Sequence, residues 1–172
     1  MDTSTSPETA QHPAPREVRL DTVAAQTAAI DELILLARHT LQVFDIDLSQ
    51  TGWETAARAA NLTAFLRRVP AVRFDLIVHD TRWMEASCPR LLNLLRLHSS
   101  SITVYKTGPE ARVATDPLIV VDGRHFLHRF HIEQPRATLV IENPNQAMPL
   151  VNRFQEIWAT GEPGMAGTVL GL

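Results

Sequence analysis

The chain is poor in cysteine and in long apolar runs. Cys88 is the single cysteine among 172 residues, so the chain cannot form an internal disulfide or a site of several thiolates, which fits a reducing cytoplasm. No apolar run approaches the roughly 18 residues of a membrane span, and the N-terminus lacks the basic and apolar segments of a signal peptide. We therefore expect a cytoplasmic protein without membrane contact.

Glycine is scarce as well, with seven residues in the chain. Neither the Walker A motif nor the dinucleotide-binding glycine motif is present, and no Gly-x-Ser-x-Gly sequence marks a nucleophilic serine. These absences exclude the nucleotide sites and serine hydrolases that such motifs identify, and we expect no cofactor.

Neither sign of charge dominates, because 16 Lys and Arg stand against 19 Asp and Glu for a formal net charge of −3. A nucleic acid would have to bind a local basic patch rather than a general positive field. Many arginines are scattered over predicted helices and strand starts, which indicates solvated faces: Arg58, Arg67, Arg68, Arg73, Arg82, Arg90 and Arg96. We do not favour nucleic acid as a partner, although a local patch would permit it.

The segment 116–123, D-P-L-I-V-V-D-G, predicts a central strand that is buried on both faces and ends in a turn. Apolar patterns predict further strands at 17–20, 41–47, 72–79, 101–107, 125–132 and 137–142. They predict helices at 23–38 and 53–68, one from 81 that Pro89 kinks or restarts, and one from 143 to 158. Helices between the early strands imply parallel pairing, and the consecutive late strands imply antiparallel pairing. We therefore predict an α/β fold, a three-layer α/β sandwich with a mixed sheet.

The domain boundaries follow from composition. Residues 1–16 are polar and rich in Ser, Thr and Pro, which predicts a disordered N-terminal tail or linker. We expect a single α/β domain over 17–160 and a C-terminal tail over 161–172, whose apolar residues could dock on the domain.

Residues 41–159 resemble one half of the phospholipase D fold. That superfamily carries the motif His-x-Lys-x4-Asp on a strand and its following turn, with a later Gly-Ser-x-Asn and a closing helix. If the motif's aspartate is placed on Asp122, Thr115 falls at the histidine and Pro117 at the lysine, and the nearest remnant of Gly-Ser-x-Asn is 143–145, N-P-N. The segments L-I-V-H-D, C-P-R-L-L-N-L-L-R and S-S-I-T-V-Y-K resemble an uncharacterised bacterial phospholipase D-like family that is sometimes fused behind an acetyltransferase domain.

The resemblance implies that this chain is a pseudoenzyme. In the superfamily the histidine attacks phosphorus and the lysine neutralises its oxygens, and neither Thr115 nor Pro117 can do so. Active members also bring two motifs together, whereas this chain has one half, which implies a homodimer or a partner protein. Our first hypothesis is therefore a catalytically inactive binding or assembly module. The second is a phosphate-ester hydrolase or a protein that binds a phosphorylated ligand.

Aspartates follow several predicted strands, where ligands bind in open α/β sheets. Asp45, Asp47, Asp80 and Asp122 hold these positions and together could bind Mg²⁺. Aspartate is also common where a chain turns out of a strand or caps a helix, and we favour that interpretation.

Histidines repeat in the segment 125–131, H-F-L-H-R-F-H. Strand alternation places His125, Arg129 and His131 on one face, where the arginine would repel a metal ion and suit an anion such as phosphate. We favour a half-exposed polar face of an outer strand over an anion site. The second hypothesis rests on six candidate ligand-binding residues, with no catalytic residue or metal site assigned: Asp47, Asp80, Asp122, His125, Arg129 and His131.

Overall fold

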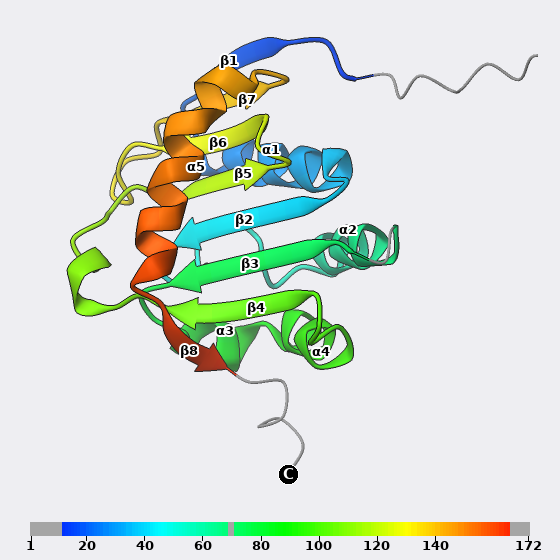
Figure 1. The fold of residues 1–172 in the computed structure, drawn as a ribbon, viewed down its shortest axis with the longest axis vertical. Helices are drawn as coiled ribbons and strands as arrows, with labels where there is room; N and C mark the ends of the chain where they lie inside the picture. Colours follow the sequence, from blue (N-terminus) through cyan, green and yellow to red (C-terminus); the bar gives the residue numbers. More distant parts are fainter. Residues whose placement is uncertain (1–11, 69–70, 166–172) are drawn as a thin grey trace, which may run out of the picture.

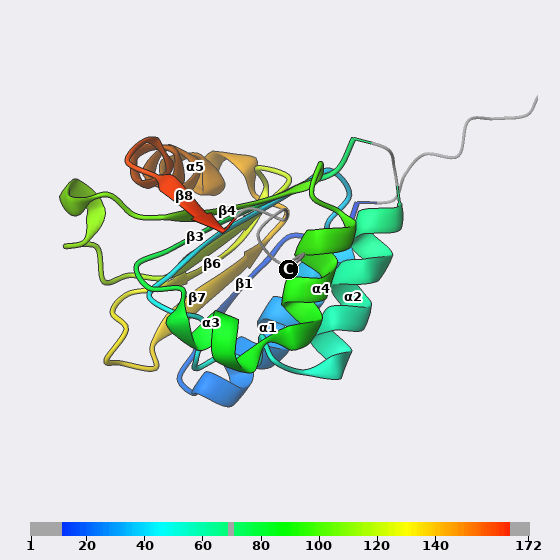
Figure 2. The same cartoon turned by 90° about the horizontal axis from the view of Figure 1, so that it is seen from below.

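The computed structural model describes residues 12–68 and 71–165, and its sheet carries helices on both faces (Figures 1 and 2). The strands are β1 (Arg16–Leu20), β2 (Thr40–Asp45), β3 (Arg73–Val78), β4 (Ile102–Lys106), β5 (Leu118–Val121), β6 (His125–Arg129), β7 (Ala137–Ile141) and β8 (Glu162–Met165). The helices are α1 (Val23–Leu36), α2 (Ala56–Arg67), α3 (Arg82–Ser87), α4 (Pro89–Leu97) and α5 (Pro144–Ala159), with a 3₁₀ turn η1 (Pro109–Ala111). The predicted three-layer α/β sandwich with a mixed sheet is confirmed.

The order of strands across the sheet is β1-β7-β6-β5-β2-β3-β4-β8. β2, β3 and β4 run parallel because helices connect them, and the other neighbours pair antiparallel. All four residues of β5 are buried, as the apolar run predicts. The turn after it uses Asp122 and Gly123, whose φ angles of 53° and 66° lie in the left-handed region that aspartate tolerates and glycine adopts freely.

The two faces of the sheet bury separate apolar cores. Helices α1 to α4 cover one face, and α5 alone covers the other (Figure 2). The α5 stripe of Ala147, Leu150, Phe154 and Ile157 is buried as its helical spacing predicts. Within the described residues, no helix combines the length and the apolar character that a membrane span requires.

Pro89 does not kink a continuous helix but starts a new one. α3 ends at Ser87, and Pro89 stands in the first turn of α4, where its missing N–H is not needed. This is one of the two outcomes that the sequence left open.

Arg58 is not on a solvated face, so that prediction is wrong for this residue. Its side chain is 0% exposed, its Nε donates to Asp31 Oδ1 at 2.7 Å, and its guanidinium lies 4.7 Å from the ring centre of the buried Trp53. A buried arginine is tolerated here because a carboxylate and an aromatic face compensate for the water that it loses.

Both chain ends contribute to the sheet more than their composition predicts. β1 begins at Arg16, inside the expected tail 1–16, and β8 lies inside the expected tail 161–172 and pairs with β4. The rest of the expected tails, 1–11 and 166–172, lies outside the described residues. We missed β8 because Pro163 and Gly164 are typical of turns, yet proline is tolerated in a strand at the edge of a sheet.

Candidate functional site

Polar residues gather at two ends of the sheet, which we name from the parallel strands. The carboxyl end is where β2, β3 and β4 finish, and the amino end is where they begin. Asp47 and Asp80 follow β2 and β3 at the carboxyl end. Because β5 runs antiparallel to β2, Asp122 lies at the amino end instead. The structure therefore does not bring the predicted strand-end aspartates together.

Asp47 and Asp80 organise the loops that follow their strands. The Asp47 carboxylate accepts a hydrogen bond from the Ser49 N–H at 2.9 Å. The Asp80 carboxylate accepts from the Arg82 N–H at 2.9 Å and from its guanidinium, and these bonds lower the pKa of Asp80 to about 2. In the part of the chain that the structure describes, no group of three acidic, histidine or cysteine side chains could hold a metal ion.

Arg129 closes one side of the carboxyl end. Its guanidinium is 4% exposed and donates to three acceptors, at 2.7 Å to Gln134 O, 2.7 Å to Gln50 Oε1 and 2.5 Å to Ile132 O. A further bond of 2.6 Å joins Gln26 Nε2 to Pro135 O. These bonds hold the loop 130–136 against the carboxyl end.

A small cavity lies beside Arg129. The cavity beside Pro117, Asp45 and Arg129 has a volume of about 20 Å³, which is room for about one water molecule. Burial raises the pKa of Asp45 to about 6, although the Ile46 N–H donates to its carboxylate at 2.6 Å. A phosphodiester does not fit in this cavity.

The other side of the carboxyl end is held by Asp116. Its Oδ2 lies 2.9 Å from His128 Nε2 and accepts from Arg153 Nε at 2.7 Å, and its Oδ1 also contacts Arg153 Nη2. Burial raises the pKa of Asp116, but the bonds to His128 and Arg153 outweigh it and bring the pKa to about 2. Sequence reasoning missed this cluster, because nothing in the sequence pairs residue 116 with residue 153 on α5.

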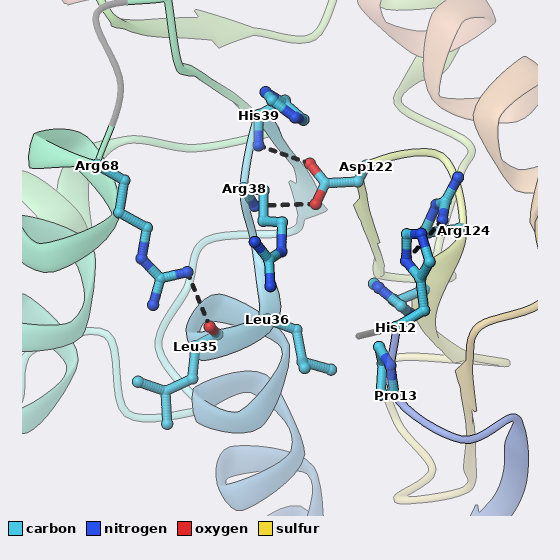
Figure 3. Close-up of a pocket in the computed structure, with 10 residues that line it drawn as sticks. His12, Pro13, Leu35, Leu36, Arg38, His39, Arg68, Asp122 and Arg124 are labelled. Carbon is cyan, nitrogen blue, oxygen red and sulfur yellow. Dashed lines mark hydrogen bonds between the residues drawn. The ribbon is translucent and has the colours of Figure 1, made fainter. Parts of the chain in front are cut away.

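A pocket of about 700 Å³ opens at the amino end (Figure 3). Its walls come from the segment before β1, the C-terminal end of α1, the end of α2 and the turn between β5 and β6. The lining residues are His12, Pro13, Leu35, Leu36, Arg38, His39, Arg68, Asp122, Arg124 and His125. Two of the six predicted ligand-binding residues, Asp122 and His125, therefore belong to this pocket.

Asp122 has a structural role in the pocket wall. Its Oδ2 accepts from the Arg38 N–H at 2.9 Å, and its Oδ1 accepts from the N–H groups of His39 and Thr40 at 2.8 Å each (Figure 3). These bonds join the turn after β5 to the chain between α1 and β2. The single residue that matches the phospholipase D motif thus stabilises the backbone.

The arginines of the pocket keep unused hydrogen-bond donors. Arg68 donates through Nη1 to Leu35 O at 3.0 Å and to Ala37 O at 2.7 Å. Arg124 donates through Nη1 to Glu142 Oε1 at 3.0 Å. Arg38 is exposed and has no ion pair with any residue in the described ranges. The sequence shows these arginines, but only the tertiary fold places them around one pocket.

Two of the three residues predicted on one face of β6 are buried, and the strand is an inner one, so the prediction of a half-exposed face on an outer strand is wrong. β6 lies between β5 and β7, and His125 and Arg129 are 3% and 4% exposed. His125 lies at the amino end, where its Nδ1 accepts from the Glu142 N–H at 2.8 Å and burial lowers its pKa. Arg129 lies at the carboxyl end, and His131 lies beyond the strand and accepts from the Glu133 N–H at 3.1 Å.

Comparison with protein families gives one match. A family described as a domain of unknown function, DUF7931, matches residues 22–166. No curated protein matches the chain.

Several solved structures share the fold. TrmBL2, an archaeal chromatin protein described as showing a novel mode of DNA binding, has a TM-score of 0.66 at 10% identity, over 91% of this chain and 56% of that one. Nuc from Salmonella typhimurium, a phospholipase D family member, has a TM-score of 0.62 at 14% identity, over 87% of this chain and 97% of that one. The phosphatidylserine synthase of Haemophilus influenzae Rd KW20 has a TM-score of 0.61 at 13% identity, over 90% of this chain and 40% of that one. The phospholipase D-like fold that the sequence resemblance implied is confirmed.

Proposed function

This chain belongs to the DUF7931 family, and from that premise and its phospholipase D-like fold we propose that it is a catalytically inactive binding module. The supporting observation is the pair of residues at the motif positions, together with the small cavity beside one of them. Thr115 and Pro117 stand where the superfamily's histidine and lysine are expected, and the space beside Pro117 holds about one water molecule. A hydroxyl without an adjacent base and an uncharged ring supply neither the nucleophile nor the cation of that reaction.

A binding role has a precedent in the fold. TrmBL2 is described as a chromatin protein with a novel mode of DNA binding. For this chain, a net charge of −3 favours a ligand smaller than a nucleic acid.

The alternative is a phosphate-ester hydrolase that uses the strand-end aspartates and the His125, Arg129 and His131 face. The two ends of the sheet divide these residues between them, so they do not converge on one reacting atom.

Hydrolysis of bis(p-nitrophenyl) phosphate tests the two functions, with and without Mg²⁺ and with a phospholipase D-family nuclease as the positive control. We expect no turnover above the protein-free rate. Turnover that co-purifies with the chain and is lost in Asp80→Ala or His131→Ala would overturn the proposed inactivity.

We propose, in addition, that the module is a homodimer. Val113 and Phe130 are large apolar residues with 84% and 55% of their surface exposed. They lie on neighbouring segments at the carboxyl end, where Ile132 N donates to Thr115 O at 2.7 Å. Contact of both side chains with a second copy of the chain would remove their apolar surface from water. Light scattering should give a dimer that Phe130→Asp converts to a monomer, and a strict monomer at high concentration would contradict dimerisation.

A further inference from the structure

We propose that the pocket at the amino end binds a small phosphomonoester, with its phosphate held by Arg38 and Arg68. This inference rests on the proposed function, because it assigns the ligand site of a binding module.

The size of the pocket fits a small molecule. Its volume of about 700 Å³ falls within the roughly 300–1,000 Å³ of ligand sites, and it is far larger than the cavity of about 20 Å³ beside Pro117. Its position is also separate from Thr115 and Pro117, at the other end of β5.

The charge of the pocket fits a dianion. Arg38 and Arg68 have no carboxylate partner among the residues that the structure describes, so they bring two uncompensated positive charges. Asp122 is the one carboxylate among the described lining residues, and backbone N–H groups occupy both of its oxygens. A phosphomonoester carries about −1.5 to −2 at neutral pH and so balances these arginines. A carboxylate, with a single charge, would leave one arginine unmatched.

The hydrogen bonds that these arginines make within the protein leave some of their N–H donors available for a ligand. Arg68 contacts the carbonyls at the C-terminal end of α1 through Nη1 alone, and Arg124 contacts Glu142 through Nη1 alone. Their Nε and Nη2 groups have no partner among the described residues, and phosphate oxygens match such donors in pairs. Figure 3 shows Arg38 between the other two in projection.

The uncharged part of the pocket suits the body of the ligand. Pro13, Leu35 and Leu36 line the pocket, and Leu35 is 52% exposed. Apolar side chains beside a cationic group favour an ester whose body is apolar or a ring. A nucleic-acid strand would instead need cations along an extended groove.

Phenyl phosphate is the probe, and its affinity for the full chain is measured by calorimetry beside that of benzoate. We expect phenyl phosphate to bind at least about tenfold more tightly than benzoate. Benzoate has a single negative charge and cannot make the charge-assisted hydrogen bonds of the second charge. Arg38→Gln should weaken phenyl phosphate by about tenfold or more, and Arg38→Lys by less, because lysine keeps the charge but not the planar fork.

Arg112→Gln is the matched control. Arg112 is exposed, follows η1 at the carboxyl end, and its removal changes net charge equally. Equal effects of the Arg38 and Arg112 variants, or equal binding of benzoate, would overturn the phosphate site. A labelled single-stranded oligonucleotide that binds far more tightly than phenyl phosphate, and depends on Arg38, would overturn the small-ligand assignment.

A measurement of phenol release from phenyl phosphate distinguishes failure of this inference from failure of the proposed function. Release of phenol with an Arg38-dependent affinity would contradict catalytic inactivity and would still support the site. Absence of binding together with absence of turnover would overturn the site and leave the proposed inactivity standing.

Discussion

The two ends of the sheet both carry arginines, histidines and aspartates, but they differ in how these side chains are paired and in the space beside them. At the carboxyl end, Arg129 and Asp116 make hydrogen bonds to the loop 130–136 and to α5, and the cavity beside Pro117 has room for about one water molecule. At the amino end, Asp122 directs its bonds to the backbone, while Arg38 keeps its guanidinium free of described ion pairs and a pocket stays open. Charged side chains whose hydrogen bonds are all made within the protein thus hold loops and helices in place. A charged side chain without such partners remains able to bind a ligand.

The largest expected effect comes from breaking the closure itself. Arg129 is 4% exposed, and Arg129→Ala leaves three acceptors without their donor: Gln134 O, Gln50 Oε1 and Ile132 O. Each acceptor that is left buried without a donor costs about 1–3 kcal/mol, so we expect a total loss of about 3–5 kcal/mol. Urea denaturation should show this loss, and the exposed Arg112→Ala should change the free energy of unfolding little. A loss below about 1 kcal/mol would show that Arg129 does not hold the loop.

The second effect tests whether Asp122 is structural. Asp122→Ala leaves the N–H groups of Arg38, His39 and Thr40 without their acceptor, and should cost about 2–3 kcal/mol. Asp122→Asn should cost less, because asparagine keeps one acceptor oxygen and tolerates the φ angle of 53°. Equal stability of the alanine and wild-type proteins in denaturant titrations would contradict this role.

The third effect is a dependence on pH from Asp45. Its pKa is about 6 in the folded state against 3.8 for the ordinary group, so the folded state holds the proton more tightly than the unfolded state. The stability that protonation provides is complete below about pH 4 and is lost as pH rises through 6. Asp45→Asn should therefore stabilise the fold by about 2 kcal/mol at pH 7.5 and by almost nothing at pH 4. Thermal unfolding at both pH values checks this, and a variant less stable at pH 7.5 would contradict it.

The smallest effect on stability belongs to the pocket. Arg38 is exposed and makes no side-chain hydrogen bond to the described residues, so Arg38→Gln should change the free energy of unfolding by less than about 0.5 kcal/mol. The same substitution should weaken phenyl phosphate strongly, which separates binding from folding. A large loss of stability in urea would instead assign Arg38 to the fold.

The sequence predicted the elements well where one local pattern decides them. The apolar run 118–121 predicts a strand buried on both faces, and the stripe of α5 predicts its buried side, because both patterns are complete within one segment. β8 could not be predicted in this way, since Pro163 and Gly164 resemble a turn until β4 offers them an edge.

The candidate site was harder to predict, because strand direction and neighbours decide it. Asp122 follows a strand just as Asp80 does, but the antiparallel direction of β5 places it at the other end of the sheet. β6 is an inner strand because β7 pairs along its edge, and the sequence did not show which strands lie at the edge of the sheet. The arginines of the pocket are far apart in the sequence, and only the fold places them around one pocket.

Backbone amide shifts during a titration with phenyl phosphate test the central claim most directly, because they locate the ligand at one end of the sheet or the other. The account predicts that the amides of residues 38–40 and 123–125 shift, while those of Asp47, Asp80 and Asp116 do not. Shifts confined to the carboxyl end would contradict it, and would show that a ligand binds near Thr115 and Pro117 instead.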